Sequence, residues 1–318
     1  MESLVRTFLQ EVYHLNAYRI ARMTTGVGGD TFRVNTGDGA FVFKIVRADS
    51  INHPEREAGL CDFLLHRGLP VSQFCATTGG QLTASWPDGR TCHLQRLIPG
   101  RNFAMNTAPD WFMAESPVLL ARLHTALADH ERLPEGIGTG FFAHMTPENA
   151  LHSYRASLDL ARSRGEDAVC EALCLRIHLA EKLATWRIDP SPLTCVNTHG
   201  DYTVNQILCD DGRITGVIDW TSACVHPVVW ELTRSYFYAA PECAQGRYDP
   251  RRFDNWVNAY DNLCPLSSAD RSAILDVYLY QLLVCDYYAQ YLHAAPHEAA
   301  EFLQQADFAT AVLRHALM

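Results

Sequence analysis

Two carboxylates, Asp201 and Asp219, stand out because each adjoins a short run of β-forming residues. Asp201 lies in Thr-His-Gly-Asp-Tyr, and Asp219 lies in Gly-Val-Ile-Asp-Trp. One loop carboxylate can orient and deprotonate an acceptor hydroxyl, while a second can hold the magnesium ion that neutralises nucleotide phosphates. Alone, either aspartate would be read as an ordinary turn residue. Together they indicate phosphoryl transfer.

The segment between the two carboxylates predicts a β-hairpin. The runs 207–209 and 214–218 are rich in Ile, Leu and Val, and Asp-Asp-Gly-Arg separates them. An Asp-Gly pair between two such runs is a typical hairpin signal. A tight hairpin brings its outer ends together, so it can place Asp219 near the start of the first strand.

His-Gly-Asp followed by Ile-Asp-Trp resembles the aminoglycoside phosphotransferase and choline kinase superfamily, the small-molecule relatives of protein kinases. The resemblance covers most of the chain and is sharpest in this block. It implies that Asp201 is the catalytic base and that Asp219 binds magnesium. The family carries a second metal ligand, Asn, five positions after the base, where this chain has Gln206 and has Asn205 one place earlier. Ile207-Leu208 matches the family pattern without a gap only if Gln206 takes that place, so we expect Gln206 to be the second ligand.

The first hundred residues contain the features expected to bind ATP. Residues 24–31 form a glycine-dense turn in which Gly26, Gly28 and Gly29 would let backbone amides approach an anion, although a plain β-turn explains them equally well. The run 41–46 alternates as a strand does and places Lys44 in its middle. Lys44 at a kinase-like distance after the turn favours a phosphate-binding role for both.

A helix is expected to begin at Pro54 and to end before Gly68. The resemblance implies that a glutamate of this helix pairs with Lys44, and the spacing favours Glu57 over Glu55. Acidic residues are also common at helix N-termini without any such role. Further along, Ile98-Pro99-Gly100 is typical of a hinge, and the resemblance places the adenine contact on the backbone just before it, with Gln95, Leu97 and Ile98 as the candidates.

The expected fold class is α+β, a bilobal protein-kinase-like fold with a β-rich N-lobe and a mostly helical C-lobe. We expect a nucleotide-binding lobe at 1–98 and a helical lobe with the catalytic loop and substrate site at 99–318. Strands at 72–77 and 91–98 would complete the first lobe. Helical patterns cover 2–13 in the first lobe and, in the second, 111–128, 147–164, 167–186, 227–239, 250–262, 269–293 and 298–317.

The composition limits the possible partners and location of the protein. The net charge of −10 argues against nucleic acid as a partner, and 48% hydrophobic content in 318 residues suffices for a sizeable core. The 11 cysteines include no Cys-x-x-Cys pair, so they are expected to be reduced core residues. No apolar run is long enough to cross a bilayer and no leader is evident, which predicts a cytoplasmic protein without a membrane partner.

The acceptor is expected to be a small molecule, with a cationic one among the options. Aromatic residues of the last helices and around Trp230 could form a cation-binding cage, although an aromatic stripe at helical spacing is more often core. Acidic residues, namely Glu231, Asp254, Asp261 and Asp286, could line the same site or a solvated face. The expected activity is ATP- and Mg²⁺-dependent phosphorylation of a hydroxyl. A catalytically silent nucleotide-binding module is the alternative, and a protein kinase is disfavoured because 219–227 is too short for an activation segment.

Overall fold

The computed structural model describes residues 1–23, 29–46, 53–296 and 298–318, which form two compact units. Unit 1 consists of Met1–Asn102 and Gln206–Ala223, and unit 2 of Phe103–Asn205 and Cys224–Met318. This division differs from a single boundary after residue 98, because the hairpin of β7 (Ile207–Asp210) and β8 (Arg213–Val217) returns to unit 1. Backbone bridges from Arg101 to Cys209 and from Val71 to Val217 hold it there.

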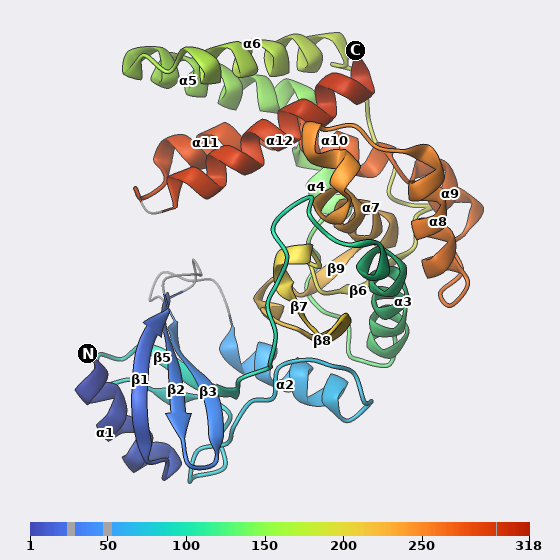
Figure 1. Ribbon diagram of the computed structural model, residues 1–318. Coiled ribbons are helices and arrows are strands. Elements are labelled where there is room, and N and C mark those ends of the chain that lie inside the picture. The colour runs from blue at the N-terminus through green and yellow to red at the C-terminus, as the bar shows by residue number, and fades with distance from the viewer. Residues whose placement is uncertain (24–28, 47–52, 297) are drawn as a thin grey trace. The chain divides into compact units, whose positions relative to one another are not determined.

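Unit 1 is built on a five-stranded antiparallel sheet in the order β1-β2-β3-β5-β4 (Figure 1). Side chains of β3 alternate between its two faces. Phe41, Phe43 and Ile45 are buried in one hydrophobic cluster with Val5 and Leu9 of the first helix. Lys44 therefore lies on the opposite face, because neighbouring strand residues point to opposite sides. The elements of this unit are α1 (Glu2–Tyr13), β1 (Ala17–Met23), β2 (Gly29–Thr36), β3 (Gly39–Val46), α2 (Pro54–Leu65), β4 (Ala84–Ser85) and β5 (Thr91–Arg96).

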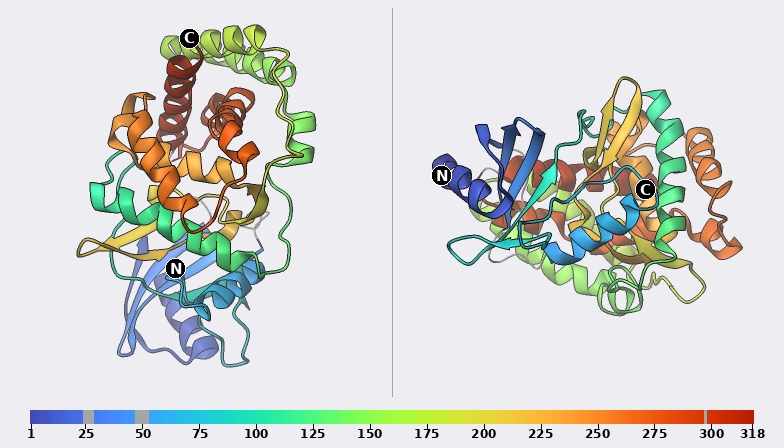
Figure 2. Two further views of the ribbon diagram at one scale, coloured as in Figure 1. Left: turned by 90° about the vertical axis from the view of Figure 1, so that its right-hand side faces the viewer. Right: turned by 90° about the horizontal axis from the view of Figure 1, so that it is seen from below.

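Unit 2 is mostly helical and contains one small sheet, in which β6 (Cys195–Thr198) pairs with β9 (Cys224–Pro227). The long helices α5 and α6 lie side by side in Figures 1 and 2. The helix α7 begins directly after β9 and is buried along most of its length. The α-helices of unit 2 are α3 (Asp110–Leu127), α4 (Thr139–His144), α5 (Pro147–Arg164), α6 (Asp167–Lys182), α7 (Val228–Ala239), α8 (Pro250–Asp261), α9 (Ser268–Ala273), α10 (Asp276–Val284), α11 (Tyr287–His293) and α12 (Ala299–Leu317).

The α+β fold with a β-rich first part and a helical second part is confirmed, as are most of the expected elements. Three expectations were wrong in detail. Residues 72–77 form no strand and meet β5 only through a bridge at Phe74 and isolated backbone hydrogen bonds. The helix expected at 167–186 ends at Lys182. The helix expected at 269–293 is split into α9, α10 and α11.

The break between α10 and α11 has a physical cause. The buried guanidinium of Arg176 donates hydrogen bonds to the carbonyl oxygens of Leu282 and Cys285, the latter at 2.8 Å, and so satisfies the end of α10. Asp286 then caps α11, because its carboxylate accepts a hydrogen bond from the Ala289 N–H at 3.0 Å. Arg176 comes from α6, so Asp286 as a possible N-cap is the local signal of the break that the sequence at 282–286 contains.

Candidate active site

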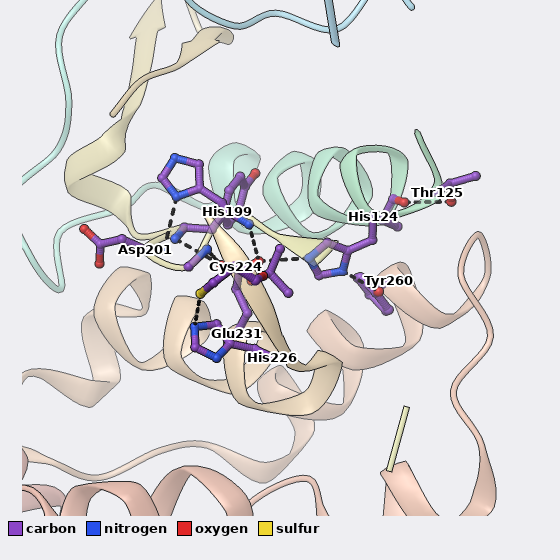
Figure 3. A network of polar contacts seen from close by, with 12 residues as sticks. His124, Thr125, His199, Asp201, Cys224, His226, Glu231 and Tyr260 are labelled. Atoms are coloured by element: carbon purple, nitrogen blue, oxygen red, sulfur yellow. Dashed lines mark hydrogen bonds and ion pairs between the residues drawn. The ribbon is translucent and has the colours of Figure 1, made fainter. Parts of the chain in front are cut away.

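The loop that carries Asp201 follows β6 and is held by one buried carboxylate of α7. Glu231 accepts hydrogen bonds from the backbone N–H groups of Gly200 at 2.6 Å and of His199 at 3.3 Å. The Asp201 N–H donates to Nδ1 of His199 at 3.1 Å. Figure 3 shows these contacts, with the Asp201 carboxylate pointing away from them. The loop backbone is therefore fixed from inside unit 2, while its carboxylate is presented outward.

Glu231 is ionised although it is almost fully buried. Burial raises its pKa, but hydrogen bonding and charge from His124, together with His199 and His226, outweigh burial and lower that pKa to about 2. His124 Nε2 lies 2.8 Å from Glu231 Oε2, and its Nδ1 lies 2.7 Å from the Tyr260 hydroxyl. His124 therefore supports the carboxylate that holds the loop.

The Asp201 carboxylate forms an ion pair with Arg234, one turn after Glu231 on α7. Arg234 Nη1 lies 2.6 Å from Asp201 Oδ1, and the two side chains are 15% and 29% exposed. The guanidinium stacks against Tyr238 at 4.6 Å and Trp230 at 5.5 Å from the ring centroids. Burial lowers the pKa of Arg234, but the Asp201 charge outweighs it and raises the pKa above its usual range. The Asp201 carboxylate is thus held in place by a permanent cation.

Asp219 follows β8 in unit 1 and has an unusual backbone. Its φ of 61° and ψ of 66° lie in the left-handed region, which Asp and Asn tolerate better than most residues with a Cβ. Its Oδ1 accepts a hydrogen bond from the Thr221 hydroxyl at 2.6 Å. The Gln206 carbonyl accepts from the Ile218 N–H at 2.9 Å, which ties Gln206 to the residue just before Asp219. The hairpin therefore brings Asp219 and Gln206 together, as expected.

Lys44 and Glu57 belong to the same unit as Asp219, and Glu57 interacts electrostatically with both of the other residues. Glu57 is 4% exposed, and burial raises its pKa to about 7, although the charge of Lys44 and a hydrogen bond from the Trp220 backbone N–H lower it. Asp219 acts in the opposite direction, because its negative charge raises the pKa of Glu57. The side chain of Glu57 thus lies in reach of Lys44 and of the segment after Asp219. Glu55, the other helix acid, is exposed and accepts from the Thr83 hydroxyl at 3.3 Å.

His93 of β5 is a neighbour of Lys44 that the sequence analysis did not single out. The two residues are directly paired in the β3–β5 ladder. Both ring nitrogens of His93 are buried without a hydrogen-bond partner, and burial together with the Lys44 charge lowers its pKa to about 3. His93 is therefore uncharged at neutral pH, so it adds no second positive charge beside Lys44.

The structure describes only some of the residues that are expected to contact the phosphates and the adenine. Gly26 and Gly28 lie outside the described residues. Gly29 is required by packing, because a Cβ there would lie 2.1 Å from the Ile45 carbonyl oxygen, with φ at 152°. Leu97 donates its N–H to the Ala40 carbonyl at 2.9 Å, so that group already serves the sheet. The Gln95 backbone is likewise paired with Val42 in the β3–β5 ladder, which leaves the backbone of Ile98 as the better candidate for an adenine contact.

The acidic and aromatic residues considered for the acceptor site serve other purposes. Asp261 pairs with Arg271, and Asp286 caps α11. Trp230 lies against the chain's own cation, Arg234, rather than lining an empty cage. Asp254 is exposed, which agrees with a solvated helix face. Several other aromatic side chains are buried in the core, namely Trp220, Tyr236, Trp256, Tyr278, Tyr280 and Tyr288.

Three further findings bear on the expected chemistry. All 11 cysteines are free; four of them are buried as core residues, whereas six are partly buried and Cys174 is exposed. The described part of the chain contains no group of three or more His, Cys, Asp and Glu side chains arranged to hold a metal ion. Within the same residues, none of the helices combines the length and apolarity needed to cross a membrane.

A β-rich unit that bears Lys44 and Glu57, followed by a helical unit that bears Asp201, is the architecture of a kinase-like phosphotransferase. The chain belongs to the phosphotransferase enzyme family, whose model matches residues 19–266. The resemblance drawn from His-Gly-Asp and Ile-Asp-Trp is thereby confirmed, and so is the assignment of the chain as a phosphotransferase. Among curated protein sequences, none matches the chain.

Solved structures of similar fold span nearly the whole chain at low identity. Amicoumacin kinase hAmiN, in complex with AMP-PNP, Ca²⁺ and Ami, is 13% identical to this chain with a TM-score of 0.67, and the match covers 99% of this chain and 94% of that of the kinase. Spectinomycin phosphotransferase APH(9)-Ia with ADP and spectinomycin is 12% identical with a TM-score of 0.65, covering 99% and 97%. A microcompartment-associated aminopropanol kinase is 16% identical with a TM-score of 0.62, covering 100% and 98%.

Proposed function

We propose that this protein is an ATP-dependent small-molecule kinase that transfers the γ-phosphoryl group to a hydroxyl of its acceptor. The observation that carries the proposal is the presentation of Asp201, whose loop backbone is bound by Glu231 and whose carboxylate is bound by Arg234. A general base must be held in one orientation to accept the proton of an acceptor hydroxyl. Two α7 side chains supply that restraint from within unit 2.

The proposed nucleotide site draws on unit 1. Lys44 would bind the phosphates, Glu57 would hold Lys44, and the backbone of Ile98 would contact the adenine. The glycine-dense turn that includes Gly26, Gly28 and Gly29 is assigned to the phosphates by its place between β1 and β2.

The proposed metal ligands are Asp219 and Gln206. Their carboxylate and amide oxygens are hard donors that suit Mg²⁺, which usually binds through one or two carboxylates together with nucleotide phosphates. When bound there, the ion would neutralise charge on the phosphates. The backbone hydrogen bond between Gln206 and Ile218 supports the pairing of these two ligands.

A catalytically silent nucleotide-binding module is the alternative, and Gln206 is the observation that favours it. Glutamine extends one methylene beyond the family's asparagine, and Mg²⁺ tolerates poor octahedral geometry badly. The braced and ion-paired state of Asp201 argues against this alternative, because binding alone requires no oriented base. Both candidates predict nucleotide binding, so turnover separates them.

The acceptor class is proposed from the family and from the charges near the base. Solved structures of similar fold include an amicoumacin kinase, a spectinomycin phosphotransferase, an aminoglycoside phosphotransferase in complex with hygromycin B, and an aminopropanol kinase. We therefore propose a hydroxylated small molecule such as an aminoglycoside, an amino alcohol or a homoserine-like compound. A cationic acceptor would have to place its charge away from Arg234, because this guanidinium already lies beside Asp201.

A coupled ADP-release screen tests the proposal. Purified protein with Mg-ATP is assayed against aminoglycosides, spectinomycin, macrolides, amino alcohols, homoserine and thiosugars, with casein as a protein acceptor. We expect turnover with at least one small hydroxylated compound and none with casein. Asp201→Asn serves as the control and should keep nucleotide affinity while losing roughly two or more orders of magnitude in turnover. Tight nucleotide binding without any turnover would support the silent module instead.

A further inference from the structure

Arg234 and Glu231 bind the same loop at different points. Glu231 accepts hydrogen bonds from backbone N–H groups of the loop, whereas Arg234 forms an ion pair with the side chain of Asp201. The two residues lie one turn apart on α7, so they project from neighbouring positions of a buried helix. Fixing the backbone leaves the side-chain torsions of an aspartate free to rotate. The ion pair with Arg234 removes that freedom.

Arg234 is itself held by aromatic rings. Trp230 lies four positions before it and Tyr238 four positions after it, so the three side chains form one stripe along α7. The guanidinium lies 4.6 Å from the centroid of Tyr238 and 5.5 Å from that of Trp230. A planar guanidinium can stack on such rings and still direct its N–H groups at a carboxylate, which a lysine ammonium cannot do equally well.

We propose that Arg234 is a positioning residue for the catalytic step, which fixes the rotamer of Asp201 through Oδ1 and is in turn fixed by Trp230 and Tyr238. This proposal rests on the proposed function, in which Asp201 is the base. A carboxylate has about four acceptor positions on two oxygens, so pairing one oxygen with Arg234 leaves acceptor capacity for a hydroxyl proton. The cation also disfavours rotation of the carboxylate away from its working orientation.

The tests use three Arg234 variants and one matched control. Arg234→Ala, Arg234→Gln and Arg234→Lys are assayed for ADP release from Mg-ATP with water and with the acceptor found in the screen. The control is Arg252→Ala, which removes an arginine of α8 that pairs with Asp110 and Glu242. We expect Arg234→Ala to lower kcat roughly ten- to a hundredfold while the KM for ATP changes little, because a misoriented base impairs chemistry and not nucleotide binding. Arg252→Ala should match the wild type.

Two readouts separate positioning from mere stabilisation of the fold. Added methylguanidinium should restore part of the turnover of Arg234→Ala and none of that of Asp201→Asn. The double variant with Asp201→Asn and Arg234→Ala should be no slower than Asp201→Asn alone, because residues that act as a unit are not additive. Should Arg234→Ala fail to fold, Arg234→Lys keeps the charge and should show a reduced kcat with an unchanged KM for ATP.

The outcomes distinguish the two proposals. Wild-type kcat in folded Arg234→Ala or Arg234→Lys, or an additive loss in the double variant, overturns the positioning role and leaves the kinase proposal intact. Absence of turnover by the wild-type protein with every acceptor and with water overturns the kinase proposal, and the positioning role falls with it.

Discussion

The carboxylate of Glu231 lies 2.6 Å from the backbone nitrogen of Gly200, and this contact joins the core of unit 2 to the loop that carries Asp201. Glu231 is 1% exposed, so its negative charge is stabilised by hydrogen bonds and neighbouring histidines instead of water. The loop that presents Asp201 therefore depends on a charge that the solvent does not reach. Removal of that charge should affect both stability and turnover.

Glu231→Gln should destabilise the protein at neutral pH. A pKa lowered from its ordinary 4.5 to about 2 corresponds to about 3 kcal/mol of unfolding free energy. Because the folded-state pKa lies below the unfolded one, this contribution is fully present above about pH 4.5 and is lost as the pH falls toward 2. Urea unfolding should show that the loss of unfolding free energy relative to the wild type is smaller at pH 3 than at pH 7.

The control for that measurement is Glu181→Gln, which breaks an ion pair with Arg155 whose two side chains are about half exposed. Exposed pairs contribute about 0 to 1 kcal/mol, so this variant should stay close to the wild type at both pH values. A Glu231→Gln protein with a pH-independent loss would show that its carboxylate acts through packing and not through charge.

Asp219→Asn should weaken the magnesium dependence of nucleotide binding, because it removes the ligand's negative charge while it preserves the backbone. Asparagine tolerates the left-handed conformation that Asp219 adopts at φ 61°, whereas alanine would add strain to the loss of the ligand. Calorimetry of ATP binding with and without Mg²⁺ measures the effect. Asp211→Asn is the matched control, because Asp211 also has positive φ, at 47°, but is exposed in the hairpin turn. Equal magnesium dependence in Asp219→Asn and wild type would reduce Asp219 to a turn residue.

The sequence predicted the elements whose signals are local. The helix α1 and the strand β3 follow from the periodicity of their apolar residues, and the β7–β8 hairpin follows from its Asp-Gly turn. These elements carry Lys44 or lead to Asp219, which is why the positions of both residues could be predicted. The residues 72–77 were mistaken for a strand because an apolar run does not reveal whether a partner strand continues alongside it.

The supports of the base could not be predicted, because they come from contacts between segments distant in the sequence. Glu231 was noted only as one acid among four, and Arg234 was not considered. The available signal was their spacing of one helical turn on a helix that follows Asp219 closely. Nothing in that spacing shows that the helix is buried beneath the Asp201 loop. The same holds for His93, whose pairing with Lys44 depends on the register of β5.

Glu57→Gln should stabilise the protein at alkaline pH and lower its turnover. The folded-state pKa of Glu57, about 7, lies above its ordinary value of 4.5, so wild-type stability falls as the pH rises through this window. The glutamine lacks this penalty, and its advantage should grow by about 3 kcal/mol between pH 4.5 and pH 8. Turnover should fall because Lys44 loses its anionic partner.

Urea unfolding at the two pH values and ADP release at pH 8 measure these effects of Glu57→Gln. Glu55→Gln on the same helix is the control, since Glu55 is exposed. A stability difference that does not depend on pH would contradict the assignment of Glu57 as a buried, titrating partner of Lys44.

Gln206 and Asn205 offer two registers for the second metal ligand, and the structure supplies an argument for Gln206. Its carbonyl is bound to the Ile218 N–H, next to Asp219, and Gln206 belongs to unit 1 with Asp219, whereas Asn205 belongs to unit 2. A glutamine oxygen lies about 1.5 Å farther from the backbone than an asparagine oxygen, so the site must relax around it.

We expect Gln206→Ala to lower turnover severely, Gln206→Asn to be tolerated, and Asn205→Ala to be milder than Gln206→Ala. Magnesium titrations of turnover in the three variants decide between the registers, because only the loss of a true ligand should raise the Mg²⁺ concentration needed for half-maximal rate. A larger loss in Asn205→Ala would move the ligand to Asn205.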